Sequence, residues 1–489
     1  MSFPVYSIPK ADYLTILPEL VLAGFGVIVM MAESFFTKGR SRKPLGWIAC
    51  AGALAALVAT WYQAGSPHIA GFFNMVLVSE FSVFFHVIVE LVLLACLLGS
   101  LDYVDRQHLR AGEFYALMLL GAVGMDLMSS ATELVLIFVA LEISSISTYI
   151  LAGMRRRVAS SAEASLKYFL LGSFATAFFL YGISLMFGAT GTTNIVVLRS
   201  LLQGGSSGPL VFAAVALMLV GLGFKVASAP FHVWTPDVYE GAPAPVVAFM
   251  STAPKAAAFA VLLRVLFAAW TPGWFWPVWI GAALSMTLGN IGALRQTNIK
   301  RLLAYSSIAH AGYLLVAIAA SNAAGISAAI FYAGAYAAMN AGAFLLIAHI
   351  AGEGERFVSI DDYAGLSHRQ PAIAASFAVL LLSLIGIPAT GGFFAKFYVF
   401  SAALQANLVG LTILGLINSG IAAYYYLRVI VVMYMREHPA QHEHGHGVER
   451  LTVPEGIAVT LSVLVTLYLG ILPNHVLQHA IQSAKDLLR

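Results

Sequence analysis

Charged side chains are scarce in this chain of 489 residues: only 10% are Asp, Glu, Lys or Arg, while 60% are hydrophobic. The mean hydropathy of +0.86 lies far above the range of soluble domains, so the sequence predicts an integral membrane protein surrounded by a lipid bilayer. The net charge of +3 is too small to favour a nucleic-acid partner, and we expect none.

Cysteine is almost absent as well. The two cysteines, Cys50 and Cys96, both fall in apolar runs and are too few for a four-ligand zinc site or an iron–sulfur cluster, so we expect ordinary core residues. The sequence also lacks a Walker phosphate loop, a dinucleotide fingerprint and a serine or cysteine nucleophile motif. Chemistry on a soluble substrate is therefore not the expected function.

Long apolar runs dominate what is present. Fourteen runs of about 20 residues, the length that crosses a bilayer, are bounded by charge or by Gly and Pro. They lie at residues 13–36, 44–64, 78–101, 113–130, 132–153, 163–189, 209–229, 244–270, 274–294, 302–320, 326–350, 371–404, 407–435 and 453–476. The sequence therefore predicts an all-α membrane protein with about 14 transmembrane helices.

Basic residues gather on one side of this predicted bundle. The connections after odd-numbered spans hold Lys38, Arg40, Arg42, Lys43, Arg106, Arg110, Arg155, Arg156, Arg157, Arg295, Lys300, Arg301, Arg356, Arg369, Arg436 and Arg450. The opposite side holds Lys10, Arg199, Lys485 and Arg489. The positive-inside rule places the richer side in the cytoplasm and both termini outside.

Two predicted spans contain a helix break. As one helix the run 371–404 would reach about 50 Å at 1.5 Å per residue, longer than the hydrocarbon core, and Gly386–Gly392 (GIPATGG) offers a break in it. A matching interruption, Ser228–Pro230, lies near Lys225. Paired interruptions in the two halves of a transporter indicate where its site lies.

The predicted spans group into four parts, and two of these parts each contain one of the breaks. Residues 1–112 hold helices 1–3, residues 113–270 a first five-helix repeat (helices 4–8), and residues 271–436 a second (helices 9–13). Residues 437–489 hold a His-rich loop and helix 14. The broken helix is the fourth member of each repeat.

Several ionisable residues fall deep inside the predicted spans. Glu142 and Lys255 are the eleventh and twelfth residues of theirs, close to the midplane, where a lysine costs about 2.5–3.5 kcal/mol to insert. Such residues usually mark an ion or proton route. For Glu142 the alternative is a protonated carboxyl bonded to a neighbouring helix.

Three further candidates lie near the breaks or in a core span. Lys225 is close to the end of its span, so a side chain that extends to the membrane surface is an alternative. Lys396 follows the GIPATGG break by four residues. His310 is suited to a proton relay because it titrates near neutral pH, although a buried histidine is often only a hydrogen-bonded core residue.

Other charges have more local interpretations. Glu90 and Asp126 are deep enough to titrate but lie near no broken helix. Glu163 and Lys167, four residues apart, predict a local ion pair, and Arg264 and Arg428 are expected to reach headgroups or a loop. The run His442–His446 is expected to be a solvated connector, with metal binding as the alternative.

The five deep residues Glu142, Lys225, Lys255, His310 and Lys396 have the composition of a proton wire that runs parallel to the membrane. A desolvated lysine can lose and regain a proton when a nearby carboxylate moves or changes charge. We therefore expect them to act in proton transfer, with no catalytic, cofactor-binding or metal-binding residues on this chain.

Long motifs around these residues occur in order through the middle of the chain. They are FVALEISSISTYIL (138–151), EASLKYFLLGSFATAFFLYGISLMFGATGT (163–192), GFKVASAPFHVWTPDVYEGAPAPVVAFMSTAPKAAAF (223–259), GNIGALRQTNIKRLLAYSSIAHAGYLL (289–315) and GIPATGGFFAKFYVF (386–400). In these stretches the sequence resembles the antiporter-like proton-pumping subunits of respiratory complex I, the NADH-quinone oxidoreductase, and among them subunit N most closely.

The resemblance implies a fourteen-helix fold with two inverted five-helix repeats and discontinuous helices 7 and 12. By motif, it assigns Glu142 and Lys225 to an input half-channel as a coupled pair, Lys255 to a connection, His310 to a central hydrophilic axis, and Lys396 to an output half-channel towards the periplasm. A lysine at 396, where subunit M would have a glutamate, favours subunit N. So does an end at Arg489 without the long lateral helix of subunit L.

The resemblance also implies where the redox chemistry lies. NADH, FMN, iron–sulfur clusters and quinone are expected on partner subunits, so this chain would belong to a translocase and carry no cofactor. The expected partners are other membrane-arm subunits, including the other antiporter-like ones, in a bacterial inner membrane. Pumping would be driven by conformational or electrostatic coupling along the axis.

Two alternatives stay open at this point. The chain resembles a subunit of a multisubunit cation/proton antiporter in its expected fold and buried lysines. It is also compatible with a scaffold subunit whose channel is vestigial, although leucine or methionine would stabilise a scaffold better than charges near the midplane.

Overall fold

The computed structural model describes residues 10–36, 41–65, 68–203, 208–268, 274–437 and 450–488, and this part of the chain is almost wholly helical. The helices are α1 (Lys10–Thr15), α2 (Leu17–Glu33), α3 (Lys43–Ala64), α4 (Glu80–Arg106), α5 (Ala111–Ser130), α6 (Leu134–Ala152), α7 (Ala159–Thr190), α8 (Ile195–Gln203), α9 (Pro209–Lys225), α10 (Thr235–Gly241), α11 (Ala244–Met250), α12 (Ala253–Ala268), α13 (Phe275–Leu294), α14 (Ile299–Ala319), α15 (Ala323–Ile350), α16 (Leu366–Arg369), α17 (Pro371–Ile385), α18 (Gly391–Gln405), α19 (Val409–Met435), α20 (Val453–Ile471) and α21 (Pro473–Leu488). Two 3-10 turns, η2 (Glu353–Glu355) and η3 (Ile360–Tyr363), and an antiparallel hairpin of β1 (Ile69–Gly71) and β2 (Val76–Val78) complete the described elements.

Many of these helices are long enough to span a membrane. Within the described ranges, eleven helical segments are long and apolar enough to cross a bilayer, and α9 and α17 are shorter apolar helices. A helix satisfies its backbone hydrogen bonds internally, which is why such apolar sequences fold this way in lipid. The predicted helical membrane architecture is confirmed, while the count of fourteen spans stays a prediction.

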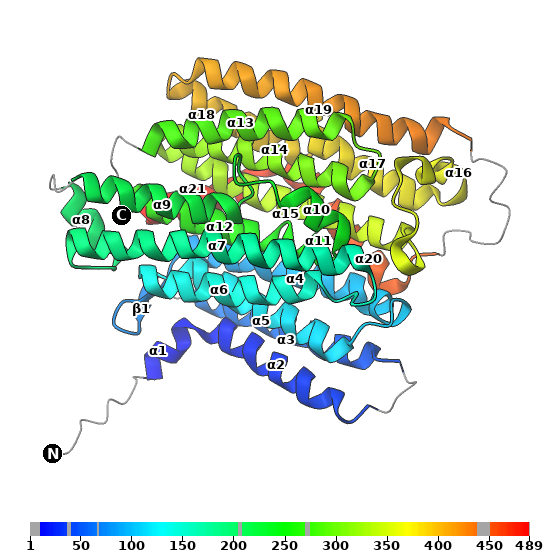
Figure 1. Ribbon diagram of the computed structural model, residues 1–489, viewed down its shortest axis with the longest axis horizontal. Coiled ribbons are helices and arrows are strands. Elements are labelled where there is room, and N and C mark those ends of the chain that lie inside the picture. Colours follow the sequence, from blue (N-terminus) through cyan, green and yellow to red (C-terminus); the bar gives the residue numbers. More distant parts are fainter. Residues whose placement is uncertain are drawn as a thin grey trace.

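The most enclosed helices lie in the middle of the molecule. In their most apolar stretches, α14 is 94% buried, α15 is 89% buried, and the α11–α12 segment is 100% buried. In α7, α13, α19 and α20 only 39% of that stretch is buried, so their outer faces meet lipid or other chains. Figure 1 shows α2 and α3 at one edge of the bundle and α19 at the opposite edge, with α15 between them.

Both predicted helix breaks are present. The chain leaves helical geometry after Lys225 at the end of α9 and resumes it at Thr235 in α10, and α17 ends at Ile385 before α18 begins at Gly391. Each break contains an alanine with positive φ, Ala227 at 58° and Ala389 at 69°, a conformation that non-glycine residues rarely adopt. The two interruptions therefore share a backbone feature that the sequence pattern did not predict.

A third interruption separates α11 from α12 at Ser251 and Thr252, three residues before Lys255. Pro254 lies in the first turn of α12, where its missing N–H costs nothing. The run 244–270, predicted as one plain helix, is therefore two helices in sequence.

A buried carboxylate ties several helices together at the ends where the basic residues gather. Glu355 in η2 forms ion pairs with Lys300 at 2.8 Å and Arg155 at 3.1 Å. Its other oxygen accepts hydrogen bonds from the Tyr103 hydroxyl and the Ala244 backbone N–H, both at 2.6 Å. These contacts join α4, the loop after α6, the start of α11 and the start of α14 to one side chain.

The charges around Glu355 determine its protonation. Burial raises the pKa of this carboxyl, but the positive charges of Lys300 and Arg155 outweigh burial, so the pKa of Glu355 lies below its usual value. A group whose pKa falls on folding stabilises the fold above its unfolded pKa and loses that effect as the pH falls.

We expect Glu355→Gln to lower the free energy of unfolding by about 3–5 kcal/mol, because it leaves two buried cations without their carboxylate. The thermal unfolding midpoint of the detergent-purified protein measures the loss. The difference in the free energy of unfolding between Glu355→Gln and wild type should stay constant near neutral pH. It should shrink only as the pH falls below about 4.3, the ordinary pKa of glutamate.

Asp361→Asn is the matched control, because Asp361 pairs with Arg436 at 3.0 Å on an exposed surface. Exposed ion pairs contribute little, so this variant should unfold like wild type. Equal midpoints for Glu355→Gln and Asp361→Asn would show that the Glu355 contacts do not hold the helices together.

Candidate functional site

Lys225 is the last residue of α9 and lies inside the protein, with only 6% of its surface exposed. Its ammonium donates a hydrogen bond to the Ser145 hydroxyl of α6 at 2.9 Å. A lysine at a helix C-terminus also neutralises the carbonyls that end the helix. Extension of this side chain to the membrane surface, the alternative left open by the sequence, does not occur.

Glu142 lies on α6, one helical turn before Ser145, and is half-buried. One of its oxygens is enclosed without a hydrogen-bond partner among the described residues. Glu142 and Lys225, both of which the structure describes, form no ion pair within 4.0 Å, so the two charges interact across a gap rather than in contact. The alternative of a carboxyl bonded to a neighbouring helix finds no support at that oxygen.

Glu142 also belongs to an outward-facing stripe of α6. Val135, Val139, Ile146 and Ile150 are 44–52% exposed and share its helix face at spacings of three and four residues. A carboxyl in the middle of an apolar stripe that faced lipid would be costly. The stripe is therefore apolar except for Glu142, which is half-buried and has one enclosed oxygen.

Lys255 lies in the first turn of α12 and is 3% exposed. Its ammonium donates hydrogen bonds to the backbone oxygen of Ser307 at 3.0 Å and to the Ser307 hydroxyl, and it lies over the ring of Tyr336 at 5.7 Å. These partners are all neutral.

His310 follows Ser307 on α14 and is surrounded by tyrosines. Its Nδ1 lies 2.7 Å from the hydroxyl of Tyr332, and its Nε2 lies 3.4 Å from the hydroxyl of Tyr426. Its ring packs against Tyr336 at 5.1 Å and Tyr313 at 5.7 Å between centroids. Phenol hydroxyls both donate and accept, so either ring nitrogen can carry the proton.

Lys396 completes the row from α18. Its ammonium donates to the backbone oxygens of Leu384 at 3.1 Å and Ile385 at 2.7 Å, the last carbonyls of α17, and to the Ser419 hydroxyl at 2.9 Å. It also lies over the Tyr313 ring at 4.9 Å. The break in helix α17–α18 thus provides the carbonyl oxygens that stabilise this buried cation.

Contacts with shared tyrosine rings join three of the five predicted site residues, Lys255, His310 and Lys396. From Lys255 the chain of contacts runs through Tyr336 to His310, and from His310 through Tyr313 to Lys396. No hydrogen bond or ion pair in the described part of the chain joins Lys225 directly to Lys255. The second half of the row is joined only through tyrosine ring faces, because the hydroxyls of Tyr313 and Tyr336 have no hydrogen-bond partner among the described residues. The first half is interrupted.

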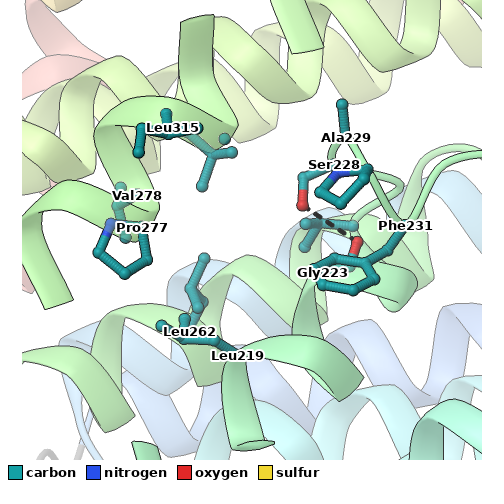
Figure 2. Close-up of a pocket in the computed structure, with 13 residues that line it drawn as sticks. Leu219, Gly223, Ser228, Ala229, Phe231, Leu262, Pro277, Val278 and Leu315 are labelled. Carbon is teal, nitrogen blue, oxygen red and sulfur yellow. Dashed lines mark hydrogen bonds between the residues drawn. The ribbon is translucent and has the colours of Figure 1, made fainter. Parts of the chain in front are cut away.

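A cavity of about 260 Å³ lies beside the α9–α10 break. Figure 2 shows Ser228, Ala229 and Phe231 from the break facing Leu262, Pro277 and Leu315 across it, with the Ser228 hydroxyl bonded to the Gly223 carbonyl at 3.3 Å. The lining is almost entirely apolar, so this cavity offers few polar groups to a transferred proton. It lies next to the row and is not part of it.

Three of the more local interpretations are confirmed. Glu163 and Lys167 form an ion pair at 2.7 Å, and Lys167 also binds Asp237 at 2.7 Å. Both cysteines are buried and free. Arg428 binds the backbone oxygens of Leu294 and Gln296 at a loop.

The interpretation of Arg264 is wrong. This residue is 6% exposed and binds the backbone oxygen of Ser129 through two nitrogens, at 3.1 and 2.7 Å. Its guanidinium lies over the Phe81 ring of α4 at 4.8 Å and against Ser129 of α5, so it is enclosed by neighbouring helices and does not reach the headgroups. The run His442–His446 lies outside the described residues.

Sequence reasoning missed the neutral partners of the lysines and histidine. They are Ser145, Ser307, Tyr313, Tyr332, Tyr336, Ser419 and Tyr426. A weak signal was available, because Tyr332 and Tyr336 are four residues apart on one helix face and Tyr313 follows His310 by three.

Known proteins resemble this chain over its whole length. The family model described as NADH:quinone oxidoreductase/Mrp antiporter, TM, matches residues 131–422. The chain is 60% identical to NADH-quinone oxidoreductase subunit N 2 of Koribacter versatilis, with 100% of each sequence covered. It is 44% identical to NADH-quinone oxidoreductase subunit N of Trichlorobacter lovleyi, with 96% of each covered.

Solved structures resemble it too. A chain of respiratory complex I from Thermus thermophilus is 38% identical, with a TM-score of 0.79, and the match covers 94% of this chain and 98% of that one. A chain of the Mrp complex from Dietzia sp. has a TM-score of 0.85 at 22% identity, covering 98% and 97%. The second likeness is one of fold alone.

We expect Ser307→Ala to lower the free energy of unfolding by about 1–3 kcal/mol, because the buried Lys255 ammonium loses a hydroxyl acceptor. Thermal unfolding in detergent measures it. Ser327→Ala is the control, since that hydroxyl binds only the Ala323 carbonyl of its own helix, at 2.8 Å. Equal losses for the two variants would contradict a stabilising role of the Lys255–Ser307 contact.

Proposed function

Because this chain belongs to the family of NADH-quinone oxidoreductase subunit N, an antiporter-like membrane subunit of a translocase, we propose that it moves protons through Glu142, Lys225, Lys255, His310 and Lys396. One observation carries the proposal. In the part of the chain that the structure describes, the three lysines bind hydroxyls, carbonyls and aromatic faces, and none forms an ion pair with a carboxylate. A lysine held by neutral groups can release its proton without leaving an unpaired buried anion.

The roles of the residues follow from their contacts. Glu142 lies one turn from Ser145, the partner of Lys225, so a change of charge at Glu142 alters the balance at Lys225. Lys255, His310 and Lys396 share the neighbours Tyr336 and Tyr313 through ring contacts. The hydroxyls of these two tyrosines have no partner in the described structure, so a proton would pass between the three residues by way of water. Glu142 and Lys225 form the entry, Lys255 and His310 the connection, and Lys396 the exit.

The direction of transfer is from cytoplasm to periplasm across a bacterial inner membrane. This assignment is supported by the asymmetry of the basic residues along the sequence, and it places both termini in the periplasm. The fourteen spans and the two inverted repeats, residues 113–270 and 271–436, belong to the same proposal. The matching breaks and positive-φ alanines at 227 and 389 support the repeat.

Redox chemistry and partners lie elsewhere in the assembly. We assign NADH, FMN, iron–sulfur clusters and quinone to other subunits, and we assign neighbouring membrane-arm subunits, including other antiporter-like ones, to the exposed faces. The α6 stripe around Glu142 supports a neighbour at that side, because it would shield this carboxyl from lipid.

The two alternative functions are a subunit of a cation/proton antiporter and a scaffold subunit, and different observations bear on each. A subunit of a cation/proton antiporter shares the fold, but the likeness to the Mrp chain is 22% in sequence against 60% for subunit N of Koribacter versatilis. A scaffold with a vestigial channel would have no need of three buried lysines, and the experiment below distinguishes it from the proposal.

We expect Lys225→Ala to abolish NADH-driven acidification of inverted membrane vesicles and quinone-linked turnover, because the entry of the row loses its proton carrier. NADH oxidation by an artificial acceptor and assembly on a native gel should stay normal. Lys167→Ala is the matched control, since the Lys167 side chain is 40% exposed and its ion pairs with Glu163 and Asp237 lie outside the row. Acidification like that of wild type in a fully assembled Lys225→Ala complex would instead support the scaffold.

Lys396→Arg separates proton transfer from charge. A guanidinium can still bind the last carbonyls of α17, so assembly and thermal stability should be kept, but it cannot lose its proton. We therefore expect acidification to be lost in this variant although the positive charge remains. Full acidification would mean that Lys396 acts as a fixed charge and that protons leave by another group.

A further inference from the structure

Four titratable side chains outside the lysine row lie together among the N-terminal helices. Glu19 on α2, His86 and Glu90 on α4, and Asp126 on α5 are each 0–3% exposed. The three carboxyls are close enough to interact electrostatically with one another. We call these four residues the acidic cluster.

Histidine and hydroxyl groups point into this cluster. His86 Nε2 lies 3.1 Å from the backbone oxygen of Asp126 and 4.0 Å from Glu19 Oε1, and the Thr60 hydroxyl of α3 donates to Glu90 Oε1 at 2.8 Å. Across the described residues, His86 Nδ1, Glu90 Oε2 and both carboxyl oxygens of Asp126 have no hydrogen-bond partner. Unpaired buried polar atoms are costly, and protons and water molecules are the ligands that would satisfy these.

The charges do not balance unless the cluster holds protons. From α12, which packs against α4 and α5, Arg264 faces the cluster, but it forms no ion pair within 4.0 Å with any of the three carboxyls in the described structure. One buried cation can offset one carboxylate. With His86 neutral, three ionised carboxylates would leave two buried negative charges uncompensated. The three carboxyls and His86 therefore hold at least two protons among them.

A line of polar groups leads from the cluster to the face that carries the β1–β2 hairpin. Gln63 lies one turn after Thr60 on α3 and donates to the backbone oxygens of Leu14 and Thr15, at 2.9 and 3.2 Å. The Thr15 hydroxyl binds the Asp12 carbonyl at 2.6 Å, and the Asp12 side chain accepts from the Phe72 N–H at the hairpin turn. The oxygen of the buried Gln63 side chain has no partner in the described residues, so this line can pass a proton through water.

We propose that Glu19, His86, Glu90 and Asp126 form a second protonatable site, separate from the lysine row, that exchanges protons with water on the hairpin face past Gln63. In each exchange a carboxyl takes a proton from hydronium, or returns one to water, and no other bond changes. The site does not depend on the proposed route through the lysines. The two are linked only through α12, where Arg264 follows Lys255 by nine residues, about 14 Å.

The test is infrared difference spectroscopy of the purified, assembled complex during exchange from H₂O to D₂O at neutral pH. Wild type should show protonated-carboxyl C=O bands that shift on deuteration, and Asp126→Asn and Glu90→Gln should each lose part of them. Thr60→Val should keep the Glu90 band and shift its frequency, because it removes only the hydrogen bond. Asp361→Asn is the control and should change nothing.

Gln63→Leu tests the route. It should keep the bands and slow their deuteration several-fold, because it removes the polar group between the cluster and the hairpin face. Spectra of Asp126→Asn and Glu90→Gln that match wild type would overturn the site. If both variants fail to assemble, an unshifted Glu90 band in assembled Thr60→Val would equally overturn the proposed site. Deuteration of the bands at the wild-type rate in Gln63→Leu would overturn the proposed route.

Discussion

The free-energy cost of placing a lysine ammonium inside a bilayer is the constraint on which this structure depends. Lys396 meets that cost with the last two carbonyls of α17, which are free only because the helix stops at Ile385. Lys225 also lies at a helix break, at the end of α9, but its ammonium binds the Ser145 hydroxyl of α6 instead. A helix interruption therefore stabilises the buried charge of Lys396 directly, while Lys225 and Lys255 depend on serine hydroxyls of neighbouring helices.

Two kinds of buried cation coexist in the chain and differ in their partners. Lys300 binds a carboxylate, Glu355, together with Arg155, and this arrangement joins helices. Lys255 binds a hydroxyl, a carbonyl and a tyrosine face instead, none of which becomes an unpaired anion when the lysine is neutral. The two lysines are both almost fully enclosed, so they differ in the chemistry of their partners and not in burial.

Sequence reasoning found the lysines and both helix breaks because each leaves a local signal, a charge in an apolar run or a Pro–Gly cluster. It did not find Ser145, Ser307 or Tyr332, because these come from other helices whose rotation is set by packing and not by a local pattern. The same limit explains Arg264, whose place near a helix end indicated headgroups while neighbouring helices in fact enclose it.

The acidic cluster and the lysine row differ in the charge of their residues and in how that charge is compensated. In the row, cations are held by neutral oxygens, so each site is stable with or without its proton. In the cluster, Asp126 and its neighbours face one another with a single cation, Arg264, nearby, so ionising one carboxyl makes it harder to ionise the next. Because Arg264 and Lys255 share the rigid helix α12, a change of charge at one site alters the field at the other across low-dielectric protein, where Coulomb interactions are screened less than in water. If the proposed site holds its protons as argued, the N-terminal helices store charge as well as provide packing surface.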